Sequence, residues 1–210
     1  MTTTAKFWDG VAEKYARSPI KDMASYEHTL ERTASYLKKT DDVLELGCGT
    51  GMTALKLSGY VGSITATDVS PGMLAVGRRN AASQSIENVT FAEADANRPP
   101  EGSFDAALAF NLLHLVEDLD LTLSRVHSVL RPGGLFISKT FCRPSSGASL
   151  KYYAVRLALP IMQFFGKAPF VRFLPEADLD AALERAGFSI IESDSFPFRD
   201  ARRFLVARKK

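Results

Sequence analysis

The sequence predicts an α/β domain in which helices cover both faces of a mostly parallel β-sheet. From residue 43 onward, short β-rich runs alternate with helical runs, an order that is typical of parallel sheets. Two β-rich runs follow each other near the end of the chain with no helix between them, which predicts an antiparallel pair at one sheet edge. The first strand of the series runs into a glycine-rich turn over residues 47–51, where the backbone is able to approach a ligand closely.

The bulk properties indicate one globular domain over residues 1–210. Hydrophobic residues make up 46% of the chain and charged residues 24%, and the formal charge of +2 is too small to indicate a nucleic-acid partner. Two cysteines, Cys48 and Cys142, provide neither a disulfide framework nor a zinc-ligand spacing, so no metal site is expected. The first residues do not resemble a signal peptide and charged residues interrupt the longest apolar run, which favours a cytoplasmic protein.

Residues 1–40 are expected to be helical, and the alternating elements follow over residues 43–142. Apolar residues recur at helical spacing in the first segment, at Phe7, Val11 and Tyr15 and again at Tyr26, Leu30, Ala34 and Leu37. Strands are then expected over 43–46, 63–69, 89–92, 104–110 and 135–140, and helices after Gly51 and over 71–82 and 119–130.

Capping and breaking residues mark the ends of these elements. Ser70 is a good N-cap for a helix that begins at Pro71. The helix over 119–130 is expected to end at Arg131-Pro132-Gly133-Gly134, because proline cannot continue a helix and glycine permits a turn.

The C-terminal third begins with an aromatic and basic insertion over residues 149–175. Apolar residues fall near helical spacing in it, and Pro160 predicts a kink or a break. Residues 176–210 are expected to form a closing helix over 176–186 and a β-hairpin with strands over 188–192 and 203–207.

The glycine loop and an acidic residue beyond it predict a ligand site. Met52 occupies the position where a dinucleotide fingerprint requires a small residue, so the loop suits a ligand without phosphates. Asp68 ends the second predicted strand about 20 residues beyond the loop, where a carboxylate would meet the ribose hydroxyls of a nucleoside. The alternatives are a plain glycine turn and an acid that caps the following helix.

These features resemble those of the class I S-adenosylmethionine-dependent methyltransferases, in particular the small-molecule branch called methyltransferase domain 11 or the ubiquinone-biosynthesis type. The resemblance implies a Rossmann-like, seven-stranded sheet of order 3-2-1-4-5-7-6 with strand seven antiparallel, and an N-terminal helical cover over the active site. Six motifs recur in the family's order, at residues 43–51, 68, 93–96, 110–114, 130–134 and 186–188.

The resemblance also implies S-adenosyl-L-methionine as cofactor and S-adenosyl-L-homocysteine (SAH) as product. Glu45 would orient the amino group of the methionine part, Asp68 would bind the ribose, and Asp95 would bond the adenine amino group. The other cofactor-binding residues that it implies are Tyr15, Gly47, Cys48, Gly49, Gly51, Val69, Met73, Ala96, Asn111 and Leu112.

Methyl transfer is an in-line displacement that needs a general base only if the acceptor loses a proton. His114 is one catalytic candidate, because it follows the fourth strand beside the methyl donor. Tyr15 is the other, because it matches a tyrosine that touches the cofactor in relatives. A structural histidine and a core aromatic residue are the alternatives.

A small molecule, apolar or lipid-like, is the expected acceptor. Asn111 is not followed by the Pro-Pro-aromatic motif of adenine-in-DNA enzymes, and neither cysteine follows a proline as in cytosine-C5 enzymes. The insertion over 149–175 would cover the acceptor near His114 and Tyr153, and its cations suit a peripheral membrane contact. The asparagine and arginine signature of quinone-ring C-methyltransferases is not found around residues 111–114, so no quinone is assigned.

Two other functions stay open at this point. A nicotinamide-dependent oxidoreductase shares the strand, glycine turn and acid, although Met52 disfavours it. A non-catalytic, S-adenosylmethionine-binding regulatory protein would carry the same cofactor motifs.

Overall fold

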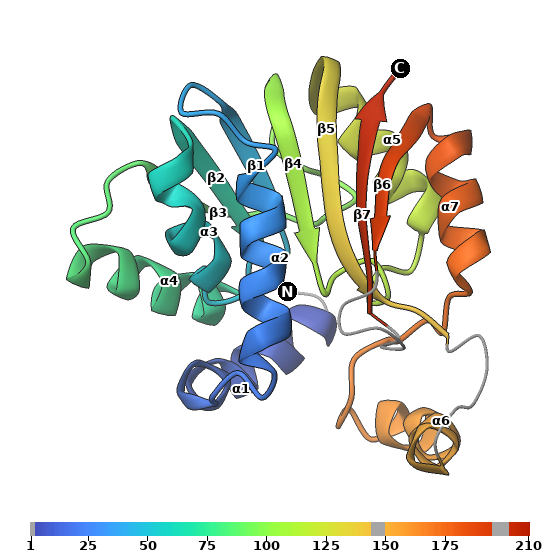
Figure 1. The fold of residues 1–210 in the computed structure, drawn as a ribbon. Coiled ribbons are helices and arrows are strands. Elements are labelled where there is room, and N and C mark those ends of the chain that lie inside the picture. The colour runs from blue at the N-terminus through green and yellow to red at the C-terminus, as the bar shows by residue number, and fades with distance from the viewer. Residues whose placement is uncertain (1–2, 144–149, 195–201) are drawn as a thin grey trace.

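The computed structural model describes residues 3–143, 150–194 and 202–210, which form a single seven-stranded sheet flanked by helices (Figure 1). The strand order is β3-β2-β1-β4-β5-β7-β6, and β7 is antiparallel to both of its neighbours. The predicted fold class, strand order and antiparallel edge are therefore confirmed.

The strands are, in chain order, β1 Asp42–Leu46, β2 Ser63–Asp68, β3 Val89–Glu93, β4 Phe104–Phe110, β5 Leu130–Phe141, β6 Phe188–Asp194 and β7 Arg202–Lys209. The helices are α1 Thr3–Arg17, α2 Met23–Ala34, α3 Met52–Leu57, the 3₁₀ turn η1 Ser58–Tyr60, α4 Pro71–Ser83, α5 Leu119–Val129, α6 Leu150–Phe164 and α7 Glu176–Arg185. No helix of the described residues is long and apolar enough to cross a membrane.

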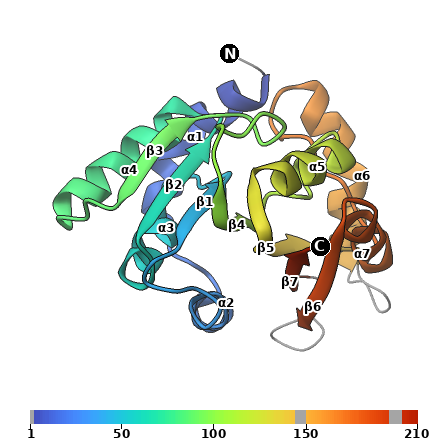
Figure 2. The same cartoon turned by 90° about the horizontal axis from the view of Figure 1, so that it is seen from above.

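Two apolar clusters form the core, one on each face of the sheet. On one face, α5 and α7 pack against the sheet through fully buried Leu123 and Leu183, which belong to the same apolar cluster as Phe136 of β5. On the other face, α3 and α4 bury Leu57 and Leu74 against β1 and β2. Figure 2, which looks along the sheet, shows these two helix layers on opposite sides of it. This sandwich is what the alternating sequence pattern predicts.

One local expectation is wrong. β5 begins at Leu130 instead of residue 135, because the chain pairs with β4 at Leu130 and Phe104 and then shifts register before Ala106. The predicted turn residues lie within this irregular start, where Gly133 has a φ of +74°. Of the kink or break that was predicted at Pro160, the break is absent, because α6 continues through this residue. Pro160 is exposed, so the carbonyl group that loses its helical partner is able to bond to water.

Candidate functional site

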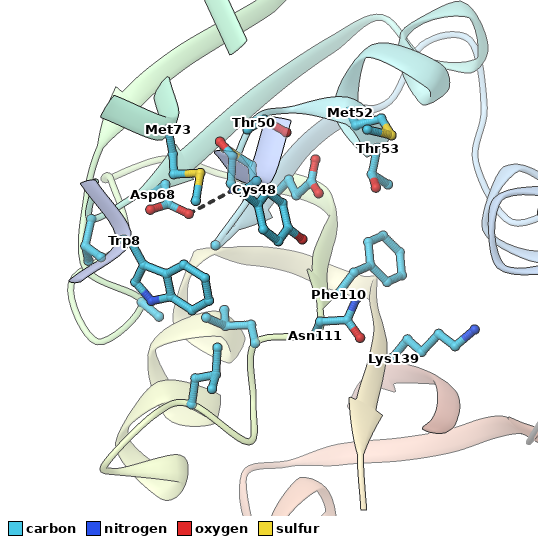
Figure 3. Close-up of a pocket in the computed structure, with 18 of the residues that line it drawn as sticks. Trp8, Cys48, Thr50, Met52, Thr53, Asp68, Met73, Phe110, Asn111 and Lys139 are labelled. Carbon is cyan, nitrogen blue, oxygen red and sulfur yellow. Dashed lines mark hydrogen bonds between the residues drawn. The ribbon is translucent and has the colours of Figure 1, made fainter. Parts of the chain in front are cut away.

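A cavity of about 580 Å³ lies at the carboxyl ends of β1, β2 and β4 (Figure 3). Ligands of open α/β sheets bind at this edge, and the volume is within the usual range for small-molecule sites. The N-terminal helices α1 and α2 contribute Trp8, Tyr15 and Tyr26 to its wall. The N-terminal helices therefore form part of the wall of this cavity.

The glycine loop forms the floor of the cavity at the end of β1. Gly47, Gly49 and Gly51 all have positive φ, of 63°, 55° and 72°. A Cβ on Gly49 would meet no atom within 4 Å, whereas one on Gly51 would lie 2.4 Å from the ring of Phe91. Gly49 therefore leaves room on the cavity side, and Gly51 lets the loop pack against β3.

Asp68, at the end of β2, is held by the loop that it faces. One carboxylate oxygen accepts a hydrogen bond from the Gly49 N–H and the other from the Ser70 N–H, both at 2.9 Å. Burial raises the pKa of Asp68, and the N–H groups that donate to it oppose the shift. The side chain lines the cavity, so its remaining lone pairs face the space where a hydroxyl-bearing ligand would bind.

Glu45 is a buried carboxylate with an unsatisfied oxygen. Its side chain lines the cavity, and Oε2 has no hydrogen-bond partner among the described residues. Burial raises the pKa of Glu45 to about 8, the negative charge of Asp68 adds to the shift, and the Ala54 N–H opposes it. A cationic ligand group would satisfy this oxygen and restore the charge of the carboxylate.

Asn111, directly after β4, adopts a left-handed conformation with a φ of 55°. Its N–H donates a hydrogen bond to the Lys139 carbonyl oxygen of β5 at 2.7 Å. Asparagine tolerates this conformation better than most residues, and the contact fixes the turn that places Asn111 and Leu112 at the cavity.

Comparison with known proteins agrees with this geometry. The family model described as a methyltransferase domain matches residues 43–134. The demethylmenaquinone methyltransferase of Thermus thermophilus is 34% identical to this chain over 165 residues, which cover 70% of this chain and 74% of that protein. That of Mycolicibacterium vanbaalenii is 31% identical over 204 residues, which cover 88% of this chain and 86% of that protein. This chain belongs to the class I S-adenosylmethionine-dependent methyltransferases.

Among solved structures, the DhpI–SAH complex aligns with this methyltransferase at a TM-score of 0.74 and 24% identity, over 99% of this chain and 95% of that chain. This likeness shows the shared fold. The family assignment makes S-adenosylmethionine the cofactor and methyl transfer the reaction, so the oxidoreductase alternative is wrong.

Most residues that the sequence analysis assigned to the cofactor lie together at the cavity of this methyltransferase. They are Tyr15, Glu45, Gly47, Cys48, Gly49, Asp68, Val69, Met73, Asp95, Ala96, Asn111 and Leu112. Asp95 accepts a hydrogen bond from the Asn97 N–H at 2.8 Å, which fixes the turn after β3.

Three predicted site residues lie elsewhere. Gly51 is not a lining residue, and the Phe91 contact accounts for it. His114 lines a separate pocket of about 240 Å³ with Phe141, because buried Leu113 enters the core before it and turns the chain. Burial lowers the pKa of His114 to about 4, so it is neutral at physiological pH. Tyr153, on α6, is 57% exposed and does not line the cavity.

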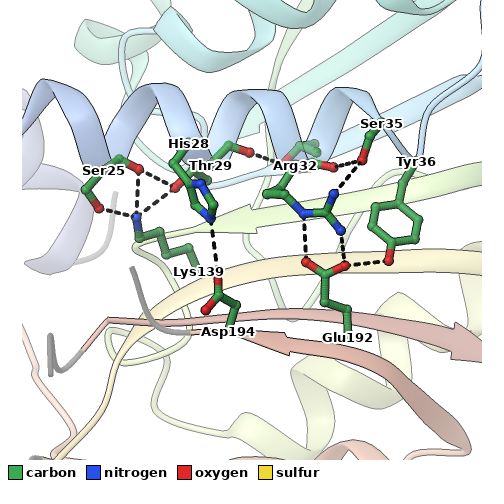
Figure 4. Close-up of polar contacts among 10 residues, drawn as sticks. Ser25, His28, Thr29, Arg32, Ser35, Tyr36, Lys139, Glu192 and Asp194 are labelled. Carbon is green, nitrogen blue, oxygen red and sulfur yellow. Dashed lines mark hydrogen bonds and ion pairs between the residues drawn. The ribbon is translucent and has the colours of Figure 1, made fainter. Parts of the chain in front are cut away.

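The sequence analysis missed several lining residues, of which Lys139 is the most informative. Its ammonium group is buried at the end of β5 and donates to the Ser25 carbonyl, to the Ser25 hydroxyl and to the Thr29 hydroxyl (Figure 4). A lysine within the apolar run of residues 135–141 is a signal that was present in the sequence. Trp8, Tyr26 and Arg202 are further large lining side chains that the sequence analysis did not assign to the site.

α1 is tied directly to the cofactor side of the cavity. Asp9 accepts hydrogen bonds from the Ser70 hydroxyl at 2.5 Å and from the Gly72 N–H at 2.8 Å. Ser70 caps α4 by accepting from the Met73 N–H. The N-terminal helix is thus fixed to the segment that follows Asp68, and it carries Trp8 to the cavity.

Proposed function

We propose that this methyltransferase transfers its methyl group to a small, largely apolar acceptor that binds in the same cavity as the cofactor. The observation that carries the proposal is that the cavity extends from the glycine loop and Asp68 to a second wall at the ends of β4 and β5. Figure 3 shows Asp68 and Met73 on one side of the cavity, and Phe110, Asn111 and Lys139 on the other. We assign the first side to the adenosine part of the cofactor and the second to the acceptor.

The cofactor side fits the group that the family binds. Asp68 would accept from the ribose hydroxyls, Asp95 would accept from the adenine amino group, and Glu45 would bind the ammonium group of the methionine part. The unsatisfied Oε2 of Glu45 supports this assignment, since a buried carboxylate without a partner is strongly destabilising. When bound, the cofactor supplies an electrophilic methyl group on a positively charged sulfur.

The acceptor side carries several apolar side chains beside the polar Asn111 and Lys139. Its walls hold the aromatic rings of Tyr26 and Phe110, and the other apolar residues nearby are Leu30, Leu115 and Val116. Such walls bind an apolar body by excluding water, while a few polar groups such as Asn111 orient it. These residues would hold the acceptor atom in line with the methyl group, and this positioning is a major source of acceleration.

The proposal assigns no general base to His114 or Tyr15. His114 lies outside the cavity. Desolvation and the nearby charge of Asp68 raise the pKa of Tyr15, so its hydroxyl stays protonated at neutral pH and acts as a hydrogen-bond donor. The reaction therefore requires an acceptor that is already nucleophilic or that loses its proton to water.

The test combines SAH calorimetry with methylation assays on a panel of apolar and polar acceptors. We expect wild type to bind SAH and to methylate apolar acceptors. Asp68→Ala should weaken SAH binding by about 1 to 3 kcal/mol, because polar partners are left unpaired. Phe110→Ala should keep SAH affinity and raise the KM of the acceptor, with Phe110→Leu as the milder control.

Two results would overturn the proposal. Methylation of polar acceptors only would contradict the apolar acceptor class. Tight SAH binding without turnover of any acceptor would favour a non-catalytic regulatory protein.

A further inference from the structure

We propose that α6 is an interfacial helix that docks this protein onto an anionic membrane surface. α6 and the residues after it carry large apolar side chains that face solvent. Leu157 is 80% exposed and Phe164 85% exposed, and Ile161, Met162 and Phe165 are exposed as well. Soluble proteins seldom expose so many large apolar residues in one segment unless it contacts a partner or a membrane.

The exposed residues form a stripe along the helix. Tyr153, Leu157, Ile161 and Phe164 follow at intervals of four, four and three residues, which places them on one face of α6. Phe165 follows directly and packs edge-on against Phe164, with the two ring centroids 5.3 Å apart. An apolar face of this kind is the part of an amphipathic helix that enters the boundary between headgroups and acyl chains.

The positive charge of the segment around α6 indicates that its apolar face fits an anionic lipid surface. Every charged residue between residues 143 and 175 is basic, namely Arg143, Lys151, Arg156, Lys167 and Arg172. Arg156 and Lys167 are exposed beside the apolar stripe. Basic residues near an anionic leaflet add attraction to the apolar insertion, so the segment matches anionic lipids in both respects.

The length of α6 requires that it lie in the plane of the membrane. Its 15 residues extend for about 22 Å at 1.5 Å per residue, which is less than the roughly 30 Å of a bilayer's hydrocarbon core.

The docking face lies beside the mouth of the methyltransferase cavity. Figure 1 shows α1 and α6 beyond the lower end of the sheet, and the cavity lies at this end, at the carboxyl ends of β1, β2 and β4. After α6, the Arg172 N–H donates to the His114 carbonyl oxygen at 2.7 Å, and its guanidinium donates to the Glu117 carbonyl oxygen at 2.5 Å. Glu117 lines the cavity, so the segment is fastened to its rim.

A second copy of the chain fits this face less well. A symmetric dimer contact would place the same basic residues of two copies against each other, and like charges across an interface repel. The inference does not depend on which acceptor the enzyme uses.

Vesicle co-sedimentation of the full chain tests the proposal. The vesicles are phosphatidylcholine alone or phosphatidylcholine with phosphatidylglycerol. We expect wild type to bind the anionic vesicles, and salt to weaken the binding. The double variant Leu157→Ser/Phe164→Ser should partition at least about tenfold less, because two large apolar side chains no longer enter the lipid. Arg156→Gln/Lys167→Gln should lose the preference for anionic vesicles.

The matched control is Tyr60→Ser, which removes an exposed aromatic residue at the amino end of β2 and should bind vesicles as wild type does. SAH binding by each variant verifies that it is folded. The proposal is overturned if wild type does not bind anionic vesicles, or if the double serine variant binds them equally well. Light scattering that shows a lipid-free dimer, lost in the serine variant, would assign the face to a second copy instead.

Discussion

The guanidinium group of Arg32 on α2 donates hydrogen bonds to both carboxylate oxygens of Glu192 on β6, with Nε 2.9 Å from Oε1 (Figure 4). The Tyr36 hydroxyl donates to the same carboxylate at 2.6 Å. On the same helix, His28 contacts Asp194 of β6 at 3.0 Å. α2 is therefore fastened to the antiparallel edge of the sheet mainly through polar contacts, and the cavity wall that it forms depends on the last strands of the chain.

Glu192→Gln should lower the free energy of unfolding by about 0.5 to 1 kcal/mol at neutral pH, because Arg32 is partly exposed and solvent screens the pair. Hydrogen bonds from Arg32 lower the pKa of Glu192, so this contribution is present above the unfolded pKa and is lost as pH falls through the folded one. Urea unfolding near pH 7 and pH 4 measures it. A double-mutant cycle with Arg32→Met that shows no coupling energy would contradict the contact.

The sequence predicted best those features that depend on residues close together in the chain. β4 has the bounds that its apolar run predicted, and the glycine loop and Asp68 meet as their spacing indicated. Such features depend on neighbours within one βαβ unit. The sequence did not predict which way His114 turns, because that depends on how Leu113 packs in the finished core.

Contacts between distant segments were also beyond prediction from the sequence. Lys139 is buried only because α2, more than 100 residues earlier in the chain, supplies Ser25 and Thr29 as acceptors. Likewise, nothing near Arg32 in the sequence indicates that its partner is Glu192. A single sequence shows a charge in an apolar run, but it does not show which partner compensates that charge.

Glu45→Gln should stabilise the ligand-free protein near pH 8 by about 1 to 3 kcal/mol. The folded pKa of Glu45, about 8, lies above its unfolded value. The stability that comes from the bound proton is complete below the unfolded pKa and is lost as pH rises to about 8, whereas the amide of glutamine stays neutral throughout. Thermal unfolding of both proteins between pH 4 and pH 8 should show curves that diverge as pH rises. Parallel curves would contradict the raised pKa.

The same residue couples cofactor binding to proton release. An ammonium group beside Glu45 favours the ionised carboxylate, so SAH binding near pH 7 should release up to about one proton from this group. Calorimetry in buffers of different ionisation enthalpy measures the number of protons. Glu45→Gln should bind SAH more weakly and release fewer protons, and proton release equal to that of wild type would assign the effect to another group.

His114→Leu should leave methyl transfer between pH 6 and pH 8 within about threefold of wild type, because His114 lies outside the cavity and is neutral there. Its effect should appear in acid stability. Burial lowers the folded pKa of His114 below the unfolded value, so wild type loses stability as pH falls from about 6.5 to about 4. The leucine variant should lose about 1 to 3 kcal/mol less over this window. An acid limb of the rate profile that disappears in His114→Leu would restore His114 as the base.

Gly51→Ala and Gly49→Ala should separate stability from cofactor binding. Both residues have positive φ, which makes alanine unfavourable at either position. Only at Gly51 does the new methyl group also meet the Phe91 ring, at 2.4 Å. Gly51→Ala should therefore lower the free energy of unfolding by about 2 to 4 kcal/mol, and Gly49→Ala by about 1 kcal/mol.

Gly49→Ala should instead weaken SAH binding, because its methyl group projects into open space beside the cavity. Urea unfolding and SAH calorimetry measure the two effects, and adding Phe91→Leu should recover part of the stability of Gly51→Ala alone. Equal losses of stability at both glycines would mean that the Phe91 contact is not what requires glycine at position 51.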